Sequence, residues 1–137
     1  MSKSIETETN WAYTETAKIR LRADGFIHVE ISTLRDQSPQ DAVENLGLAS
    51  SFCTEKRRGV ILDLRGTNPL LPETRKIYVD PQMANSYRAL ALIVSSDKVS
   101  RLMANIYMHV ARLPFPMRLF LDIEEAKEWL NGFKDTP

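Results

Sequence analysis

The sequence predicts a single α/β domain with the element order ββαβαβαβα. Two runs of alternating apolar and polar residues flank Asp24-Gly25, and further on, short apolar runs alternate with segments of helical periodicity. Strands that alternate with helices favour a mixed, mostly parallel sheet fronted by the hairpin, with helices packed on the sheet. The length of 137 residues fits one domain. We expect residues 1–10 to form a frayed N-terminal leader and residues 11–137 to form the domain.

The first half of the chain predicts a hairpin and a helix. The strands are AKIRL and IHVEI, each with one apolar and one polar face, and His28 belongs to the polar face. Ser38 is the expected N-cap of the helix, with Pro39 and Asp41 in its first turn. Its predicted buried stripe consists of Ala42, Val43, Leu46, Ala49, Phe52 and Cys53. The run EKRR (55–58) is expected to be the solvated end of this helix, with Gly59 as its stop.

The second half predicts three buried strands separated by helices. The strands are VILDL (60–64), ALALIV (89–94) and MRLFL (117–121). A helix is expected from Pro72 to about Met83, and another over residues 97–111 after a cap at Ser95 or Ser96. A final helix begins at the capping residue Asp122 and runs to about residue 132; its predicted buried side chains are Ala126, Trp129 and Leu130.

Composition excludes several classes of protein. Lys plus Arg equals Asp plus Glu at 18 each, so no overall field favours nucleic acid as a partner. The single Cys53 excludes an internal disulfide and a cysteine-rich metal site. The start of the chain has no apolar signal segment, and no apolar run approaches the ~20 residues that cross a bilayer. We therefore expect a cytoplasmic protein without a membrane span.

Five segments carry a resemblance to a known family: IRLRADGFIHVEI, GVILDLRG, RALALIVSS, VSRLMANIYM and PFPMRLFLDIEEAKEWL. Together they resemble the STAS domains, the SpoIIAA-like anti-sigma-factor antagonists, and most closely the small uncharacterised bacterial proteins of that fold. The resemblance implies a SpoIIAA-like (STAS-like) fold that acts through surface contacts. In the antagonists a phosphorylated serine lies in the turn that follows Asp63-Leu64 here; the nearest positions are Pro72 and Glu73, so the family's phosphoacceptor is missing.

The junction after the strand VILDL is the first candidate site. A strand end followed by a helix start presents unpaired N–H groups and a positive dipole end, which can hold an anion or an acidic partner. The residues of this anion- or partner-binding candidate are Asp63, Arg65, Thr67, Glu73 and Arg75. The structural alternative is that Asp63 pairs with an arginine or accepts from loop N–H groups, and that Glu73 is an ordinary first-turn residue.

The helix expected over residues 97–111 supplies a second candidate, a contact surface. It holds more apolar residues than one buried face needs, and exposed methionines often mark contact surfaces. The candidate residues are Ser96, Arg101 and Met108. Core packing of this helix and simple N-capping by Ser96 are the alternatives.

The sequence favours a binding function over catalysis. It contains no G-x-S-x-G, H-E-x-x-H or G-x-G-x-x-G motif, and neither His28 nor His109 is placed to activate a serine. We expect no catalytic residue, cofactor or metal, and a non-enzymatic interaction or regulatory module that binds a protein partner or forms a homodimer. The alternative is a small-molecule or lipid carrier, because the fold also resembles the CRAL-TRIO type and Met and aromatic side chains can line an apolar pocket.

Overall fold

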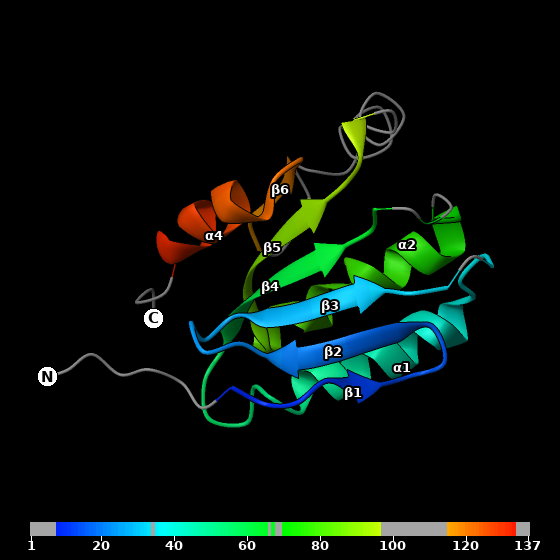
Figure 1. The fold of residues 1–137 in the computed structure, drawn as a ribbon. Helices are drawn as coiled ribbons and strands as arrows, with labels where there is room; N and C mark the ends of the chain where they lie inside the picture. Colours follow the sequence, from blue (N-terminus) through cyan, green and yellow to red (C-terminus); the bar gives the residue numbers. More distant parts are fainter. Residues whose placement is uncertain (1–7, 34, 66, 68–69, 97–114, 134–137) are drawn as a thin grey trace, which may run out of the picture.

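A six-stranded mixed sheet with helices on both faces forms the fold, in the order β1-β2-β3-β4-β5-β6 (Figure 1). The computed structural model describes residues 8–33, 35–65, 67, 70–96 and 115–133. Within these ranges the chain has three α-helices and one 3₁₀ helix, and none of the helices is long and apolar enough to cross a bilayer. The predicted α/β class with a mixed sheet is confirmed.

The N-terminal half of the sheet is antiparallel. Strands β2 (Ala17–Leu21) and β3 (Ile27–Ile31) form the predicted hairpin, and Gly25 in its turn has φ 89°, a conformation that favours glycine. A short strand that the sequence did not predict, β1 (Ala12–Tyr13), pairs with β2 at the edge. Residues 8–10 were expected to fray; the N–H of Thr9 donates to the carbonyl of Leu21 at 3.0 Å.

The C-terminal half of the sheet is parallel. Strands β4 (Arg58–Asp63), β5 (Tyr87–Ile93) and β6 (Met117–Phe120) follow in sequence order, each parallel to its neighbour. The two halves join where β3 pairs with β4, also in parallel. In that register Glu30 lies opposite Asp63 and His28 lies opposite Ile61.

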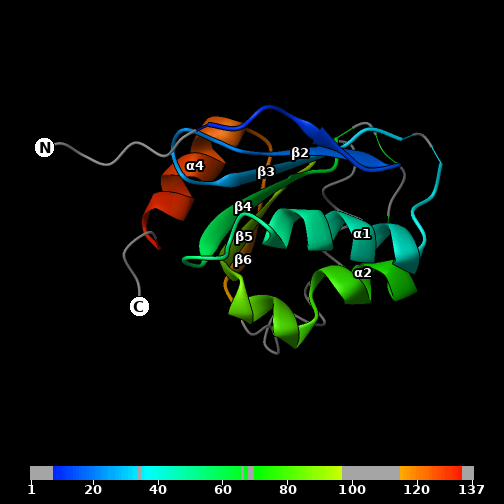
Figure 2. The ribbon, with the colours of Figure 1, turned by 90° about the horizontal axis from the view of Figure 1, so that it is seen from below.

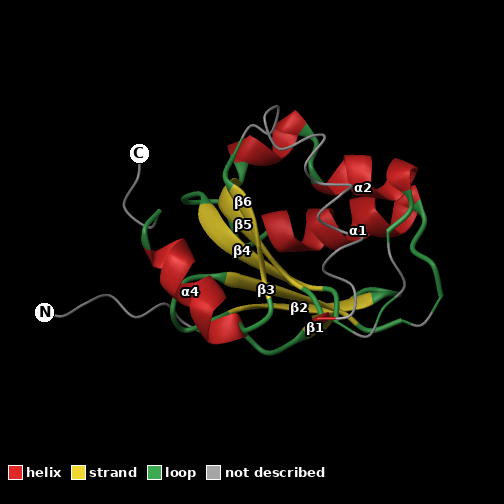
Figure 3. Ribbon diagram, turned by 90° about the horizontal axis from the view of Figure 1, so that it is seen from above, coloured by secondary structure: helices red, strands yellow, loops and turns green. Residues whose placement is uncertain are grey.

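The helices cover the two faces of the sheet unequally (Figures 2 and 3). Helix α1 (Pro39–Ser50) contacts β2 and β3 on one face, and α2 (Pro72–Tyr78) packs beside α1. Helix α4 (Ile123–Asn131) lies on the other face, against β4, β5 and β6. No described helix lies in front of β2 and β3 on the α4 face (Figure 1). Polar side chains of these two strands occupy that part of the sheet.

Helix α1 begins as predicted and ends earlier than predicted. Ser38 and Asp41 form a reciprocal capping box, but the helix ends at Ser50, so the run at 55–58 is not its C-terminus. Arg58 is buried at the start of β4, where its Nε donates to the carbonyl of Phe52 at 2.8 Å. Gly59 lies inside β4, not at a helix stop.

Close packing explains the glycine in β4. A Cβ on Gly59 would lie 3.1 Å from Leu130 Cδ2 and 3.2 Å from Phe26 Cδ1. These contacts are tight enough to force one of the neighbours to move. Gly59 therefore serves the contact between the sheet, the hairpin turn and α4. The sequence analysis singled out Gly59 correctly but gave the wrong reason: the glycine allows close packing within β4 and does not end a helix.

Two other predicted helices differ in extent. Helix α2 ends at Tyr78, and a separate 3₁₀ helix (Pro81–Asn85) follows, capped by Asp80, because a proline disfavours helix in the residue before it. Asp122 caps α4 as predicted, its side chain accepting from the N–H of Glu124. The helix expected over residues 97–111 lies outside the described residues.

The buried stripe of α1 differs from the prediction at two positions. Val43 is 50% exposed, whereas Asn45 is only 1% exposed. Ala42, Leu46 and Ala49 are buried as predicted, and Phe52 and Cys53 pack against the core while partly buried. A pattern of apolar residues does not reveal a buried amide. The predicted stripe therefore included Val43 and left out Asn45.

The amide of Asn45 organises a buried polar network. Its Nδ2 lies 3.0 Å from Thr16 Oγ1, 3.1 Å from Gln37 Oε1 and 3.0 Å from Tyr78 Oη, and it can donate to two of these at once. The Tyr78 hydroxyl donates to Gln37 Oε1 at 2.6 Å, and the Thr74 hydroxyl donates to the Gln37 carbonyl at 2.8 Å. This network ties α1 to the turn just before β2, to the loop before α1 and to α2.

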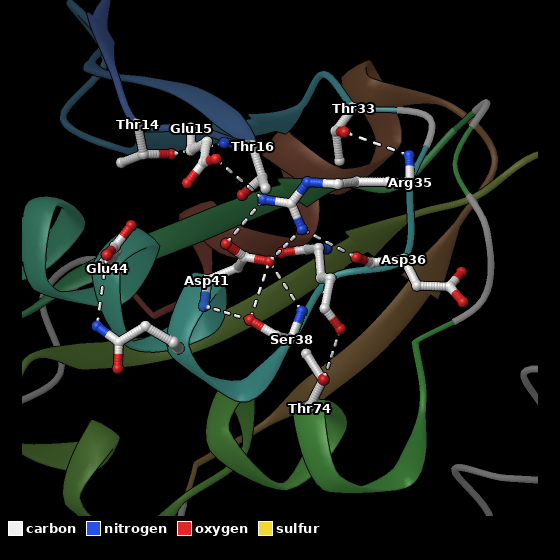
Figure 4. A network of polar contacts seen from close by, with 12 residues as sticks. Thr14, Glu15, Thr16, Thr33, Arg35, Asp36, Ser38, Asp41, Glu44 and Thr74 are labelled. Carbon is white, nitrogen blue, oxygen red and sulfur yellow. Dashed lines mark hydrogen bonds and ion pairs between the residues drawn. The ribbon is translucent and has the colours of Figure 1, made fainter.

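An ion pair at the start of α1 lies beside this network (Figure 4). The guanidinium of Arg35 donates to both carboxylate oxygens of Asp41, at 2.8 and 3.1 Å. The Ser38 N–H also donates to Asp41 Oδ2 at 2.8 Å. The Arg35 hydrogen bonds, with those from Ser38, lower the pKa of Asp41 to about 2. The loop from 35 to 38 is thereby fixed against α1.

Removing the Asn45 amide is expected to destabilise the whole fold. In Asn45→Leu the buried oxygens of Thr16, Gln37 and Tyr78 lose a shared donor, which costs on the order of 2–3 kcal/mol of unfolding free energy. Val43→Ala on the same helix is the matched control and should change stability by less than ~0.5 kcal/mol. Urea unfolding measures both variants. Equal stability of Asn45→Leu and the wild-type chain would contradict a structural role for the network.

Asp41 is expected to contribute to acid sensitivity. Because its folded-state pKa is lowered from 3.8 to about 2, its stabilising contribution is complete above 3.8 and is lost as the pH falls through 2. Arg35 is 47% exposed, so solvent screening weakens the effect. Asp41→Asn should flatten the stability profile between these pH values. An unchanged slope would show that the pair contributes nothing measurable.

Candidate functional site

Asp63 and Arg65 form an ion pair at the carboxyl end of β4. Asp63 is 4% exposed, and its Oδ1 accepts from Arg65 Nε at 3.0 Å and from the Arg65 N–H at 3.1 Å. Arg65 Nη2 donates to Oδ2 at 2.7 Å. These bonds raise the pKa of Arg65. The pairing that the structural alternative expected is therefore present, and it orients one arginine at the end of the sheet.

The other residues of this candidate site lie apart from the pair. Thr67 is buried, and its hydroxyl donates to the Leu64 carbonyl at 2.7 Å. Glu73 is exposed in the first turn of α2, and Arg75 Nη1 lies 3.5 Å from the carbonyl of Leu70. Among the described residues, neither Glu73 nor Arg75 forms a hydrogen bond or an ion pair with Asp63 or Arg65. The structure thus brings together two of the five predicted residues.

The second predicted surface is described only in part. Ser96 is exposed, three residues beyond the end of β5. Arg101 and Met108 lie outside the described residues. A contact surface that includes them stays a prediction.

His28 is buried, although the hairpin pattern placed it on a wet face. Its side chain is 7% exposed, and the Trp11 ring packs edge-on against it with ring centroids 5.3 Å apart. Lys18 and Arg20 each lie 4.6 Å from the Trp11 ring centroid, in cation–π geometry. Burial, together with the positive charge of Arg22, lowers the pKa of His28 to about 4, so its imidazole is neutral at pH 7.

His28 belongs to a cluster with Glu30 and Asp63 that the sequence analysis missed. One ring nitrogen of His28 and one carboxylate oxygen from each acid all lie within 4.8 Å of one another. Neither ring nitrogen of His28 has a hydrogen-bond partner among the described residues. Glu30 is half-buried, and its carboxylate lies 3.7 Å from Lys18 Nζ. An imidazole and two carboxylates form a ligand set for a divalent metal ion.

The sequence could have predicted only part of this cluster. The alternation of β3 places His28 and Glu30 on one face. Asp63 joins them only because β3 and β4 pair in parallel with Glu30 opposite Asp63. Neither the pairing nor its register can be read from the two segments separately.

A second group of acids has a structural explanation. Glu15, Asp41 and Glu44 also bring carboxylate oxygens within 4.8 Å of one another, near the start of α1 (Figure 4). Asp41, the buried member, is already bonded to Arg35 and Ser38. Glu15 and Glu44 are exposed. Helix capping accounts for this group.

A small cavity lies in the core between α1 and the sheet. Its volume is about 10 Å³, close to the space that a single water needs. It is lined by Val29, Asn45, Leu46, Val60, Leu62, Tyr78, Tyr87 and Leu90. This cavity is too small to hold a lipid molecule.

Because the imidazole of His28 has no hydrogen-bond partner among the described residues, we expect that replacing it by an apolar side chain does not reduce the stability of the fold. With a chelator present, His28→Leu should leave the chain as stable as the wild type or raise its stability by about 1 kcal/mol, because a buried polar group without hydrogen bonds is replaced by an apolar one. Ile27→Ala, next to it on β3, is the control and should be strongly destabilising. Thermal unfolding measures both. A large loss of stability in His28→Leu would show that the imidazole is held by polar contacts.

One family model matches most of the chain. Residues 19–134 match the family described as Domain of unknown function (DUF7793). Comparisons with curated proteins and with solved structures give no significant match. The matched region contains β3, β4 and all three residues of the His28, Glu30 and Asp63 cluster. The chain belongs to the DUF7793 family.

Proposed function

We propose that the chain is a non-enzymatic interaction module of the STAS-like type, which binds an acidic group of a protein partner at the end of β4. The likeness of its segments to STAS domains supports the type. Its described element order is a hairpin followed by parallel strands, with α1 between β3 and β4 and α2 between β4 and β5, and this order is compatible with that type. In the antagonists the residues just beyond this strand carry the regulatory serine. Here the positions nearest that serine are Pro72 and Glu73, and the pair of Asp63 and Arg65 lies at the end of the strand before them.

The fixed guanidinium of Arg65 is the observation that carries the proposal. Asp63 holds two of its three nitrogens, yet the Arg65 side chain remains 47% exposed. Among the described residues, none accepts a hydrogen bond from Nη1. An arginine that is already oriented loses less side-chain entropy when a ligand binds, and its donors match a carboxylate or a phosphate group.

The position of Arg65 also suits contact with a partner. The carboxyl ends of parallel strands are the usual binding edge of an α/β sheet. Thr67 fixes the loop after β4 from inside, through its hydrogen bond to the Leu64 carbonyl. Glu73 and Arg75 lie on α2, the next helix along the chain, and would extend the contact beyond Arg65.

Replacing Arg65 by lysine tests this proposal. Charge reversal is unsuitable because a glutamate would place a second carboxylate beside the buried Asp63. Arg65→Lys keeps the charge and removes the planar fork, so it should weaken partner binding at least about tenfold while the chain stays folded. The tagged chain is used to capture partners from the native host, and the affinity of the purified partner is then measured. Lys76→Gln, on the exposed side of α2, is the matched control.

Two outcomes would contradict the proposal. Capture of the same partner with equal affinity by Arg65→Lys and the wild-type chain would exclude a role for the fixed guanidinium. A small apolar molecule that co-purifies with the chain in native mass spectrometry would favour the carrier instead. We expect the native spectrum to show the ligand-free chain, as a monomer or a homodimer.

A further inference from the structure

We propose that His28, Glu30 and Asp63 bind a divalent transition-metal ion, with Zn²⁺ as the representative ion. The site lies on the α4 face of the sheet, where β3 pairs with β4. This inference goes beyond the proposed partner binding, because it concerns a different ligand.

The spacing of the ligand atoms is close to that of a metal site. The three candidate atoms lie within 4.8 Å of one another. Bonds of roughly 2.0–2.2 Å from Zn²⁺ to nitrogen and oxygen bring ligand atoms to about 3–4 Å apart. A contraction of at most roughly 1–2 Å therefore completes the set. Glu30 can supply it, since its side chain is long and half-buried, and its one ion pair among the described residues is with Lys18, at 3.7 Å.

The unsatisfied imidazole is a second, independent observation. His28 is more than nine-tenths buried, and both of its ring nitrogens lack a partner among the described residues. Such a group is costly unless something bonds to it. A metal ion would bond to one nitrogen, and the other N–H would then be available to a carboxylate, as is common for metal-bound histidines. A metal ion bound to His28 would therefore supply the bond that this buried imidazole lacks.

Strand pairing holds the backbone at the site. His28 and Glu30 are two residues apart on β3, and Asp63 is the direct neighbour of Glu30 on β4. Trp11 covers the imidazole from the side of the sheet edge. Three side chains on paired strands, shielded by an indole, form a more rigid site than three side chains on a loop.

Arg65 competes with the metal ion for Asp63. Both carboxylate oxygens of Asp63 accept hydrogen bonds from this guanidinium, so its positive charge lies next to the oxygens that a cation would bind and opposes that binding. Removing the guanidinium should therefore strengthen metal binding. The proposed partner binding has the opposite dependence on Arg65, and the two proposals can fail separately.

Titration of the untagged 137-residue chain with ZnCl₂ tests the site. Calorimetry measures the affinity for Zn²⁺, and the absorption spectrum of bound Co²⁺ reports which kinds of ligand surround the ion. We expect one ion per chain, a loss of affinity of at least about tenfold in His28→Gln and in Glu30→Gln, and tighter binding in Arg65→Gln. Glu44→Gln is a control from the other group of acids, and His109→Gln controls for the second histidine. Both should bind as the wild-type chain does.

Several results would overturn the proposal. These are no Zn²⁺ binding by the folded wild-type chain, equal binding by Glu30→Gln, or a loss of binding that appears only in His109→Gln. Circular dichroism checks the fold, and Glu30→Gln keeps the test decisive if His28→Gln does not fold, because Glu30 is half-exposed. Inorganic phosphate is titrated in parallel; phosphate binding that is lost in His28→Gln but kept in Arg65→Lys would assign the unpartnered imidazole to an anion site.

Discussion

The parallel pairing of β3 with β4 is the constraint on which the rest of the structure depends. It joins an antiparallel hairpin to a parallel sheet, and it fixes which side chains of the hairpin face α1 and which face the opposite side. Ile27, Val29 and Ile31 enter the core beneath α1, so His28 and Glu30 must lie on the other face. A shift of one residue would exchange the two sets. The candidate metal site and the ion pair at the end of β4 both follow from this register.

The two faces of the sheet are stabilised in different ways. Beneath α1 and α2 the core is apolar except for the network around Asn45, whose hydrogen bonds determine how both helices sit. On the other face, α4 packs on β4 to β6 through the cluster that includes Ile61, Ala91 and Leu130. Helix α4 makes its main strand contacts with β4, β5 and β6, whereas charged side chains and Trp11 lie at β2 and β3. The cluster of His28, Glu30 and Asp63 lies on this part of the sheet face, which no described helix covers.

His28 shows how a small difference in packing changes the chemistry of a residue. Alternation assigned it to a solvated face, where it would be an ordinary surface histidine. Trp11, seventeen positions earlier in the sequence, covers it and removes the water. The neutral imidazole that results is buried beside two carboxylates, one of which is engaged by Arg65. Arg65 therefore connects the proposed partner binding at the end of β4 to the proposed metal binding on the sheet face.

Local signals in the sequence determined the kind and order of most elements. Capping by Ser38 and Asp122, the turn at Asp24-Gly25 and the apolar runs of β4 and β5 depend on neighbouring residues, so they can be read without the fold. The end of α1 and the role of Gly59 could not be read in this way, because Gly59 is required by contact with Phe26 and Leu130.

The sequence by itself determined the α/β class, the hairpin and the position of Asp63 at the end of a strand. Only the tertiary structure decided that Asn45 is buried, that His28 is covered, and that Asp63 lies beside Glu30. The physical reason is the range of the interactions. Caps and turns involve residues a few positions apart, whereas strand register and burial depend on residues far apart in the sequence, such as Trp11 and His28 or Glu30 and Asp63, which meet only in the folded chain.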